Sequence, residues 1–206
     1  ICARGVRFDN AYCSASVCQP SRYSYCTGRY PGSNPHPTFL RENPYGAPAN
    51  VHFNTYLHTE IPSQGTLFQA AGYRTGVAGK WHLGEHREHL PVPEIDQDGD
   101  PADPAIDRLL REDQAVLAEH VRTTAGFDFA GGIIWCNNGD RPLKVLHDHH
   151  IEWSIGAALE FLDSCAPDQP FLLHYGSTCC HGPDPGEGLE RDAHYTPGGK
   201  VDTDRK

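Results

Sequence analysis

The stretch from Gly72 to Gly84 has the sequence GYRTGVAGKWHLG, and it is the part of the chain that decides the fold class. Small and β-branched residues over 73–78 predict a buried strand. A lysine and a histidine follow two positions apart. Residues two apart in an extended segment point to the same side. We therefore expect Lys80 and His82 to address one bound anion, while Trp81 packs the other way.

Helices and strands are expected to alternate around this stretch. A helix over 63–71, capped by Ser63, precedes the strand, and a second buried strand is predicted over 171–175. Longer helices are predicted over 105–121 and from residue 148 onward. Helix followed by strand, twice, favours an α/β fold: layered, with a largely parallel central sheet flanked by helices. The apolar face expected on the last helix comprises Ile151, Ile155, Ala158, Leu159 and Leu162.

The remaining segments are expected to be mostly irregular. Residues 31–62 contain six prolines and predict an extended loop, and the acidic, proline-rich residues 91–104 predict a surface loop. A short helix is expected over 21–27, with Pro20 in its first turn. No element is predicted after Pro183.

Length and charge limit the classes of protein to which the chain can belong. Its 206 residues, 38% of them hydrophobic, can bury a sizeable core as one large domain or part of one. The net charge of −10 argues against a protein built to bind nucleic acid, although a local cluster of cations could still bind an anionic substrate. No apolar run approaches the roughly 18 residues of a membrane span.

The ends of the sequence point to an incomplete chain. It contains no methionine and starts at Ile1, without the basic-then-apolar pattern of a signal peptide. We interpret it as a processed chain or an excerpt from a longer one.

The eight cysteines include no C-x-x-C pair, which disfavours a zinc ribbon or a thioredoxin-like site. Some could form disulfides, but they are too dilute for a disulfide scaffold. Cys18 stands apart because it precedes the predicted helix, with Arg22 one turn further on. A helix start offers free N–H groups and partial positive charge, so Cys18 is a candidate reactive side chain in an anion-binding pocket. The alternative is a small buried cysteine.

The pattern Cys18-x-Pro20-Ser21-Arg22, followed by Thr27-Gly28, resembles the signature of the type I sulfatases, in the alkaline-phosphatase-like superfamily. In that family the cysteine is oxidised to formylglycine, an aldehyde held as its hydrate. Family members usually carry two leucines where this chain has Tyr25 and Cys26. The Cys-x-Pro-x-Arg core is intact.

Other segments share the resemblance, which covers most of residues 5–185. GYRTGVAGKWHLG looks like the family's second signature. Residues 6–12 look like the family's approach to the first signature. After the strand over 171–175, His181-Gly182-Pro183 resembles a family segment that presents a histidine to the substrate.

The resemblance implies a role for each of five residues. A hydroxyl of the hydrate formed from Cys18 would attack sulfur, Arg22 would fix this nucleophile, and Lys80 would bind sulfate oxygens. His82 would assist proton movement on the diol. His181 would contact the sulfate or protonate the leaving oxygen.

The family also uses a divalent cation, usually Ca²⁺, to polarise the sulfate. Modified Cys18 is the one metal ligand we expect within this chain. The carboxylate ligands would precede Ile1 or follow Lys206. Residues 1–206 are therefore expected to be a partial sulfatase catalytic domain. On their own they should show no sulfatase turnover and weak Ca²⁺ binding.

The resemblance also implies partners and a location. The expected partners are a small-molecule or carbohydrate sulfate ester and a formylglycine-generating maturation enzyme, and the family favours a periplasmic or secreted protein. Three alternatives stay open. They are a phosphonate or phosphate-ester hydrolase of the same superfamily, a non-catalytic anion-binding domain with unmodified Cys18, and a cysteine-rich structural module.

Two further clusters are given structural interpretations. The acidic run over 96–100 resembles a calcium loop, but Pro101 replaces the turn glycine, so a solvated acidic loop is expected. His147, His149 and His150 could bind metal, but solvent-exposed histidines near a helix start are the preferred interpretation.

Overall fold

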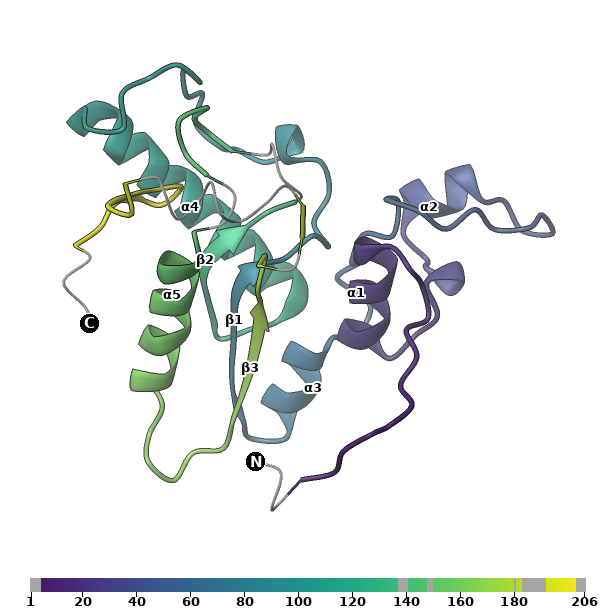
Figure 1. The fold of residues 1–206 in the computed structure, drawn as a ribbon. Coiled ribbons are helices and arrows are strands. Elements are labelled where there is room, and N and C mark those ends of the chain that lie inside the picture. The colour runs from purple at the N-terminus through teal and green to yellow at the C-terminus, as the bar shows by residue number, and fades with distance from the viewer. Residues whose placement is uncertain (1–4, 137–140, 148–149, 180, 183–191, 203–206) are drawn as a thin grey trace.

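A computed structural model of the chain describes residues 5–136, 141–147, 150–179, 181–182 and 192–202. Its centre is a parallel sheet of three strands in the order β2-β1-β3 (Figure 1). The strands are β1 (Arg74–Lys80), β2 (Phe129–Ile134) and β3 (Phe171–Gly176). Both strands predicted from the sequence are present, and the predicted α/β class with a parallel sheet is confirmed.

Helices cover both faces of this sheet (Figure 1). Val77 on β1 packs with residues of α1 (Cys18–Thr27) and α4 (Pro104–Ala125) in the main core. The next residue, Ala78, faces the opposite side and packs against α5 (Ile151–Asp163). This alternation is the period of two expected of a strand buried on both faces.

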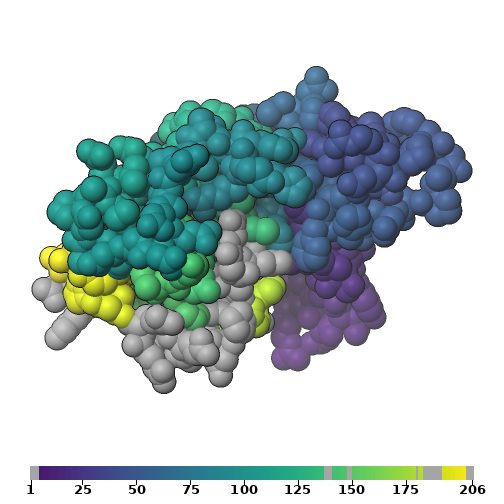
Figure 2. Space-filling model, turned by 90° about the horizontal axis from the view of Figure 1, so that it is seen from above, coloured from purple at the N-terminus to yellow at the C-terminus, as the bar shows by residue number. Residues whose placement is uncertain are grey.

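The remaining elements are short. Helix α3 (Gln64–Ala70) leads into β1, and α2 (Pro37–Glu42) lies in the segment between α1 and α3. Two single turns of 3-10 helix, η1 (Pro31–Ser33) and η2 (Arg87–His89), and a small hairpin, β4 (Tyr195–Thr196) with β5 (Gly199–Lys200), complete the described structure. In the space-filling view along the strands, the segment containing α2 projects at the end of the molecule away from α4 (Figure 2). No helix in the described part of the chain is long and apolar enough to cross a membrane.

Helix starts follow the local sequence. Ser63 caps α3 as expected, and its side chain accepts from the backbone N–H of Thr66 while the Thr66 side chain accepts from the backbone N–H of Ser63. Asp103 caps α4 by accepting from Ala105 N at 2.8 Å, and Pro104 occupies the first position, where a missing N–H costs nothing. The helix predicted over 105–121 continues to Ala125 and ends at Gly126, which has a φ of 68°.

The extended loop predicted over 31–62 is wrong in part, because η1 and α2 form within it. Pro31 and Pro37 each stand at the start of these short helices, so two of the prolines taken as signs of a loop begin helices instead. The acidic segment over 91–103 has neither helix nor strand, as expected.

Strand β2 was not predicted from the sequence. Its adjacent glycines, Gly131 and Gly132, weaken the apolar pattern of a strand. In the structure they let α5 approach closely, since a Cβ on Gly131 would lie 3.2 Å from that of Ala157. The close approach lets a strand with so little side-chain signal pack against α5, and Ile133 is its one buried residue.

The prediction of no element after Pro183 is wrong for residues 195–200. Strands of two residues have no stability of their own. Asp107 accepts from Lys200 N at 2.5 Å, and Arg111 donates to Lys200 O at 2.6 Å, so α4 holds the hairpin from outside. Residues 183–191 lie outside the described part of the chain.

The predicted apolar face of the last helix also needs correction. Helix α5 begins at Ile151 rather than near residue 148, and Ile155 and Leu159 are 41% and 49% exposed. The helix packs on the sheet through Ala158, as predicted, and through Ala157 and Phe161, which were not predicted. Glycines on the sheet draw the helix backbone close, so small side chains occupy most of the contact.

We predict that Gly76→Ala destabilises the fold while Gly156→Ala does not. A Cβ at Gly76 would lie 2.4 Å from Cδ2 of the fully buried Phe161, so the substitution should lower the free energy of unfolding by about 1–3 kcal/mol. Gly156, within α5, has no atom within 4 Å of an added Cβ. Its replacement should raise that free energy by about 0.5–1 kcal/mol through helix propensity. Urea unfolding of the two full-length variants checks the prediction, and equal destabilisation would contradict it.

Candidate active site

The predicted site residues meet where β1 and β3 end, beside the start of α1. Ligands of open α/β sheets commonly bind at the carboxyl ends of the strands. Lys80 is the last residue of β1, and His181 follows the end of β3. Cys18 is the first residue of α1, so the helix begins three residues earlier than expected. The site thus draws on three segments separated by more than fifty residues.

Cys18 lies on the wall of an open cavity of about 560 Å³, and it is partly exposed. Val17, the residue before the helix, is extended, so Cys18 stands at the first position of a helix of ten residues. At this position the helix contributes partial positive charge and N–H groups without intrahelical partners. His181 lines the same cavity, together with Phe53 and Ser21.

Lys80 is buried, with 3% of its surface exposed, and its ammonium hydrogen-bonds the side chain of Cys18. Burial lowers the pKa of Lys80, because removal from water penalises the charged form. The thiolate form of Cys18 acts in the opposite direction, and Arg22 lowers the pKa further. Lys80 is therefore a desolvated cation whose charge is favoured by an anion at the position of Cys18.

Arg22 joins the helix to the sheet. Its Nη1 donates to the backbone carbonyl of Lys80 at 2.6 Å. Gly176 on β3 leaves the space for this contact, since a Cβ there would lie 2.4 Å from the Lys80 oxygen and 3.1 Å from Arg22 Nη1. The guanidinium consequently fixes the start of α1 against the end of β1.

His82 does not continue the strand. It has a φ of 57° and is the sole non-glycine residue with positive φ in the described part of the chain, so the extended alternation expected through it ends at Lys80. Two backbone bonds to the segment after β2 hold this conformation, from Trp81 N to Ile134 O and from His82 N to Trp135 O, each 2.9 Å. Trp81 packs into the main core, as expected.

The imidazole of His82 is held in its neutral form. Burial, with 4% of the residue exposed, lowers its pKa to about 3, and the nearby charges of Lys80, Arg22 and His181 act in the same direction. Within the described structure, His82 Nδ1 has no hydrogen-bond partner. Because burial and the neighbouring cations disfavour its charged form, the imidazole is a weak base until an anion binds beside it.

Sequence patterns did not indicate two further residues at the site. Phe53 comes from the segment predicted to be an irregular loop, and its ring stacks on that of His82 with centroids 5.5 Å apart. Cys136 follows β2, the strand that was not predicted. A thiolate at this position would raise the pKa of Lys80. No local pattern marks either residue. Only the pairing of β2 with β1 and the return of the 31–62 segment bring them here.

The described residues offer few metal ligands. Among them, no group of three or more His, Cys, Asp and Glu side chains is arranged to hold a metal ion. Apart from burial, the pKa values of Lys80 and His82 are shifted by cations and thiols rather than by carboxylates. Hard cations such as Ca²⁺ prefer carboxylate and carbonyl oxygens. These residues therefore do not form a calcium site by themselves.

The structural interpretation is supported for the acidic run over 96–100 but not for the histidine cluster over 147–150. Asp98 in the acidic segment is exposed and pairs with Lys144 at 2.8 Å, as a solvated loop should. His147 and His150 are buried, so the expectation of solvent-exposed histidines is wrong for them. His150 Nε2 accepts from His147 N at 3.1 Å, so the two histidines contact each other in the interior. His149 lies outside the described residues.

The fold and the site define a class: an α/β protein with a cation-rich pocket around a cysteine at a helix start. A family model described as Sulfatase matches residues 1–202. Because the match covers nearly the whole chain, the protein belongs to the sulfatase family, and the predicted family is confirmed.

Curated relatives agree with this assignment. The chain is 28% identical to arylsulfatase A of Homo sapiens over 199 residues, which is 89% of this chain and 36% of that protein. It is 38% identical to the uncharacterized sulfatase YdeN of Escherichia coli K12 over 197 residues, 87% of this chain and 30% of that protein. A third relative is N-acetylgalactosamine-6-O-sulfatase of Bacteroides thetaiotaomicron. It is 37% identical over 84 residues, which is 41% of this chain and 15% of that protein. The chain therefore spans well under half the length of each.

We predict that His82 stays neutral down to about pH 3 and that Lys80→Met raises its pKa. Burial would persist in the variant, so the pKa should remain below the ordinary value of about 6.5. Imidazole NMR titration of the full-length protein measures both values. His194→Gln is the control, because His194 is exposed and pairs with Asp192 far from the pocket, and its loss should leave His82 unchanged. An unchanged His82 pKa in Lys80→Met would contradict the electrostatic account.

Proposed function

We propose that the protein hydrolyses sulfate esters and that Cys18, converted to formylglycine, is the nucleophile. The contact between Lys80 and Cys18 at the start of α1 carries this proposal. It places a buried cation beside the side chain from which the nucleophile would form. A pocket with cations and helix N–H groups suits a crowded anionic centre such as the transition state of sulfate transfer.

The first chemical step forms a sulfated enzyme. In the hydrate derived from Cys18, one hydroxyl oxygen bonds to sulfur while the bond from sulfur to the leaving alkoxide breaks. His82 accepts the proton of the attacking hydroxyl, because the bound sulfate anion offsets the cations that lower its pKa. His181, which lines the same cavity, donates a proton to the leaving oxygen. Lys80 balances the negative charge on the sulfate oxygens, and Arg22 fixes the nucleophile and offsets its charge.

The second step regenerates the aldehyde. His82 first releases its proton to water and then accepts the proton of the remaining hydroxyl of the sulfated hydrate. The oxygen of that hydroxyl forms the C=O bond while the bond from carbon to the sulfate oxygen breaks. Sulfate leaves, and water adds to the aldehyde to restore the hydrate. A serine in place of formylglycine lacks this second hydroxyl, so its sulfate ester would need attack by an external water molecule.

A bound Ca²⁺ would polarise the sulfate when present, and of the described residues modified Cys18 is our candidate ligand. This assignment remains a prediction, as do the maturation enzyme that would oxidise Cys18 and the periplasmic or secreted location.

A sulfated sugar is the first substrate to test. One relative is named N-acetylgalactosamine-6-O-sulfatase, a second is named arylsulfatase A, and a third is an uncharacterized sulfatase. N-Acetylgalactosamine 6-sulfate and 4-nitrophenyl sulfate therefore sample a carbohydrate and an aryl ester.

Conversion of Cys18 is tested by mass spectrometry of the peptide that contains it. Co-expression of the full-length protein with a formylglycine-generating enzyme should lower the mass of this peptide by about 18 Da, the difference between cysteine and formylglycine. Cys18→Ala should lose both the mass change and aryl sulfate hydrolysis. An unmodified Cys18 with sulfate binding intact would instead favour the non-catalytic anion-binding domain.

Lys80→Met tests the proposed sulfate contact. Loss of one preorganised charged donor should lower kcat on 4-nitrophenyl sulfate by about 10²–10³-fold. Lys144→Met is the matched control, because Lys144 is exposed and pairs with Asp98, and it should retain the activity. Similar losses in the two variants would argue against the role of Lys80, provided that both unfold at the temperature of the parent protein. Faster turnover of a phosphonate ester than of either sulfate ester by the parent protein would favour the related phosphonate hydrolase.

A further inference from the structure

A second cavity of about 350 Å³ lies beside the pocket of Cys18. Phe53 lines both cavities, and the ring on which it stacks, His82, lines the second. The second cavity therefore begins at a proposed catalytic residue and extends away from Cys18. Its remaining lining residues are Gln19, Tyr56, Gly84, Glu85, His86, Arg87, Glu88, Trp135 and Cys136.

Hydrogen bonds fix the aromatic walls of this cavity. Buried Tyr56 places its hydroxyl 3.1 Å from His86 Nε2, and buried Trp135 donates through Nε1 to Glu85 O at 3.0 Å. The segment that carries Phe53 is tied down close by, since Thr55 N donates to Gln19 Oε1 at 3.1 Å. Walls held in this way are preformed, as they are in most small-molecule sites.

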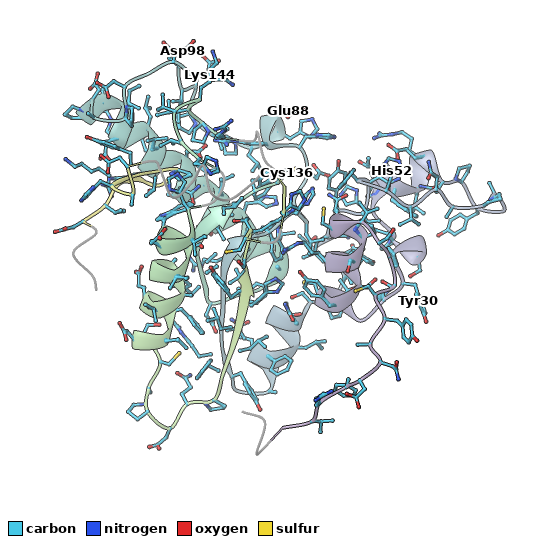
Figure 3. The ribbon with its side chains drawn as sticks, in the orientation of Figure 1. Tyr30, His52, Glu88, Asp98, Cys136 and Lys144 are labelled. Atoms are coloured by element: carbon cyan, nitrogen blue, oxygen red, sulfur yellow. The ribbon has the colours of Figure 1, made fainter. Side chains whose placement is uncertain are left out.

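Carboxylates stand at the rim. Glu88 is 74% exposed in its side chain, and Figure 3 shows it above Cys136 at the upper edge of the sheet. Glu85 holds His36 Nε2 at 2.8 Å through one carboxylate oxygen. Arg87, the cation of the lining, forms an ion pair with the buried Asp113. Glu88 lies 3.9 Å from His86 Nδ1, so both rim carboxylates contact a histidine, and their remaining lone pairs face solvent as hydrogen-bond acceptors.

These features select one kind of occupant. Aromatic faces pack against the C–H surface of a ring, and carboxylates accept from its hydroxyls in charge-assisted hydrogen bonds. The same carboxylates repel a second anion, so a heavily sulfated ligand is disfavoured. The volume lies at the lower end of the range of roughly 300–1,000 Å³ seen for small-molecule pockets, which suits a single sugar ring.

We propose that this cavity binds the uncharged, hydroxyl-bearing sugar ring to which the sulfate is attached. The proposal rests on the proposed sulfatase function, since it places the sulfate beside Cys18 and the alcohol part of the substrate beyond His82. Glu88 is then a specificity-determining residue that accepts from a ring hydroxyl.

Glu88→Gln in the full-length protein, matured by co-expression, tests this role. The substitution keeps the size of the side chain and removes its charge. The ratio of kcat/KM for N-acetylgalactosamine 6-sulfate to that for 4-nitrophenyl sulfate should fall about tenfold, because the nitrophenyl ring has no hydroxyl for Glu88 to accept from. Glu160→Gln, on the exposed side of α5, is the matched control and should leave the ratio unchanged. An unchanged ratio in Glu88→Gln would overturn the proposal.

A binding measurement separates this proposal from the proposed function. Titration of Cys18→Ala protein with unsulfated N-acetylgalactosamine, followed by NMR of the Trp135 indole, should show saturable binding that Glu88→Gln weakens about tenfold. If the matured protein hydrolyses neither ester but this binding is seen, the sulfatase function fails and the sugar site stands. If hydrolysis occurs but no sugar binding is detected at Trp135, the sugar site is wrong and the sulfatase function stands.

Discussion

The site depends on the hydrogen bond from Arg22 to the backbone carbonyl of Lys80. This bond, 2.6 Å long, connects the first turn of α1 to the last residue of β1, two segments 58 positions apart. It places the helix start, and with it Cys18, beside the ammonium of Lys80. Gly176 permits the contact, because any side chain there would collide with the Lys80 carbonyl. A tertiary hydrogen bond and one glycine thus determine where the nucleophile candidate lies.

Electrostatics in the pocket follow from this geometry and from burial. Burial lowers the pKa of both Lys80 and His82, but the neighbouring groups act on the two residues differently. An anion at Cys18 favours the charge of Lys80, whereas His82, surrounded by cations, remains neutral. Lys80 therefore offers hydrogen-bond donors to an anion, and His82 offers a neutral imidazole whose basicity rises when an anionic substrate offsets the neighbouring cations. The neighbouring cavity has the opposite character, with carboxylates at its rim, so the two halves of a substrate would meet environments of opposite charge.

Sequence reasoning succeeded where the signal is local. Ser63 caps its helix through a bond within three residues, and the two apolar strands lie where their composition places them. It failed where tertiary contacts decide. Strand β2 carries glycines that matter only because α5 packs on them, and the hairpin after residue 194 is held by Asp107 and Arg111 of α4. Cys136 was missed at the site because the unpredicted strand β2 brings it in, and Phe53 because the tertiary path of the 31–62 segment places it there.

The sequence alone determined the fold class, the family and the five candidate residues, because motif spacing and strand composition are properties of short segments. The tertiary structure decided how those residues act on one another. The positive φ of His82, which turns the chain out of the strand, depends on backbone bonds to the segment after β2. The desolvation that keeps His82 neutral, and the second cavity beyond Phe53, arise from packing between segments far apart in the chain. Burial and long-range contact are collective properties, and no local pattern of residues encodes them.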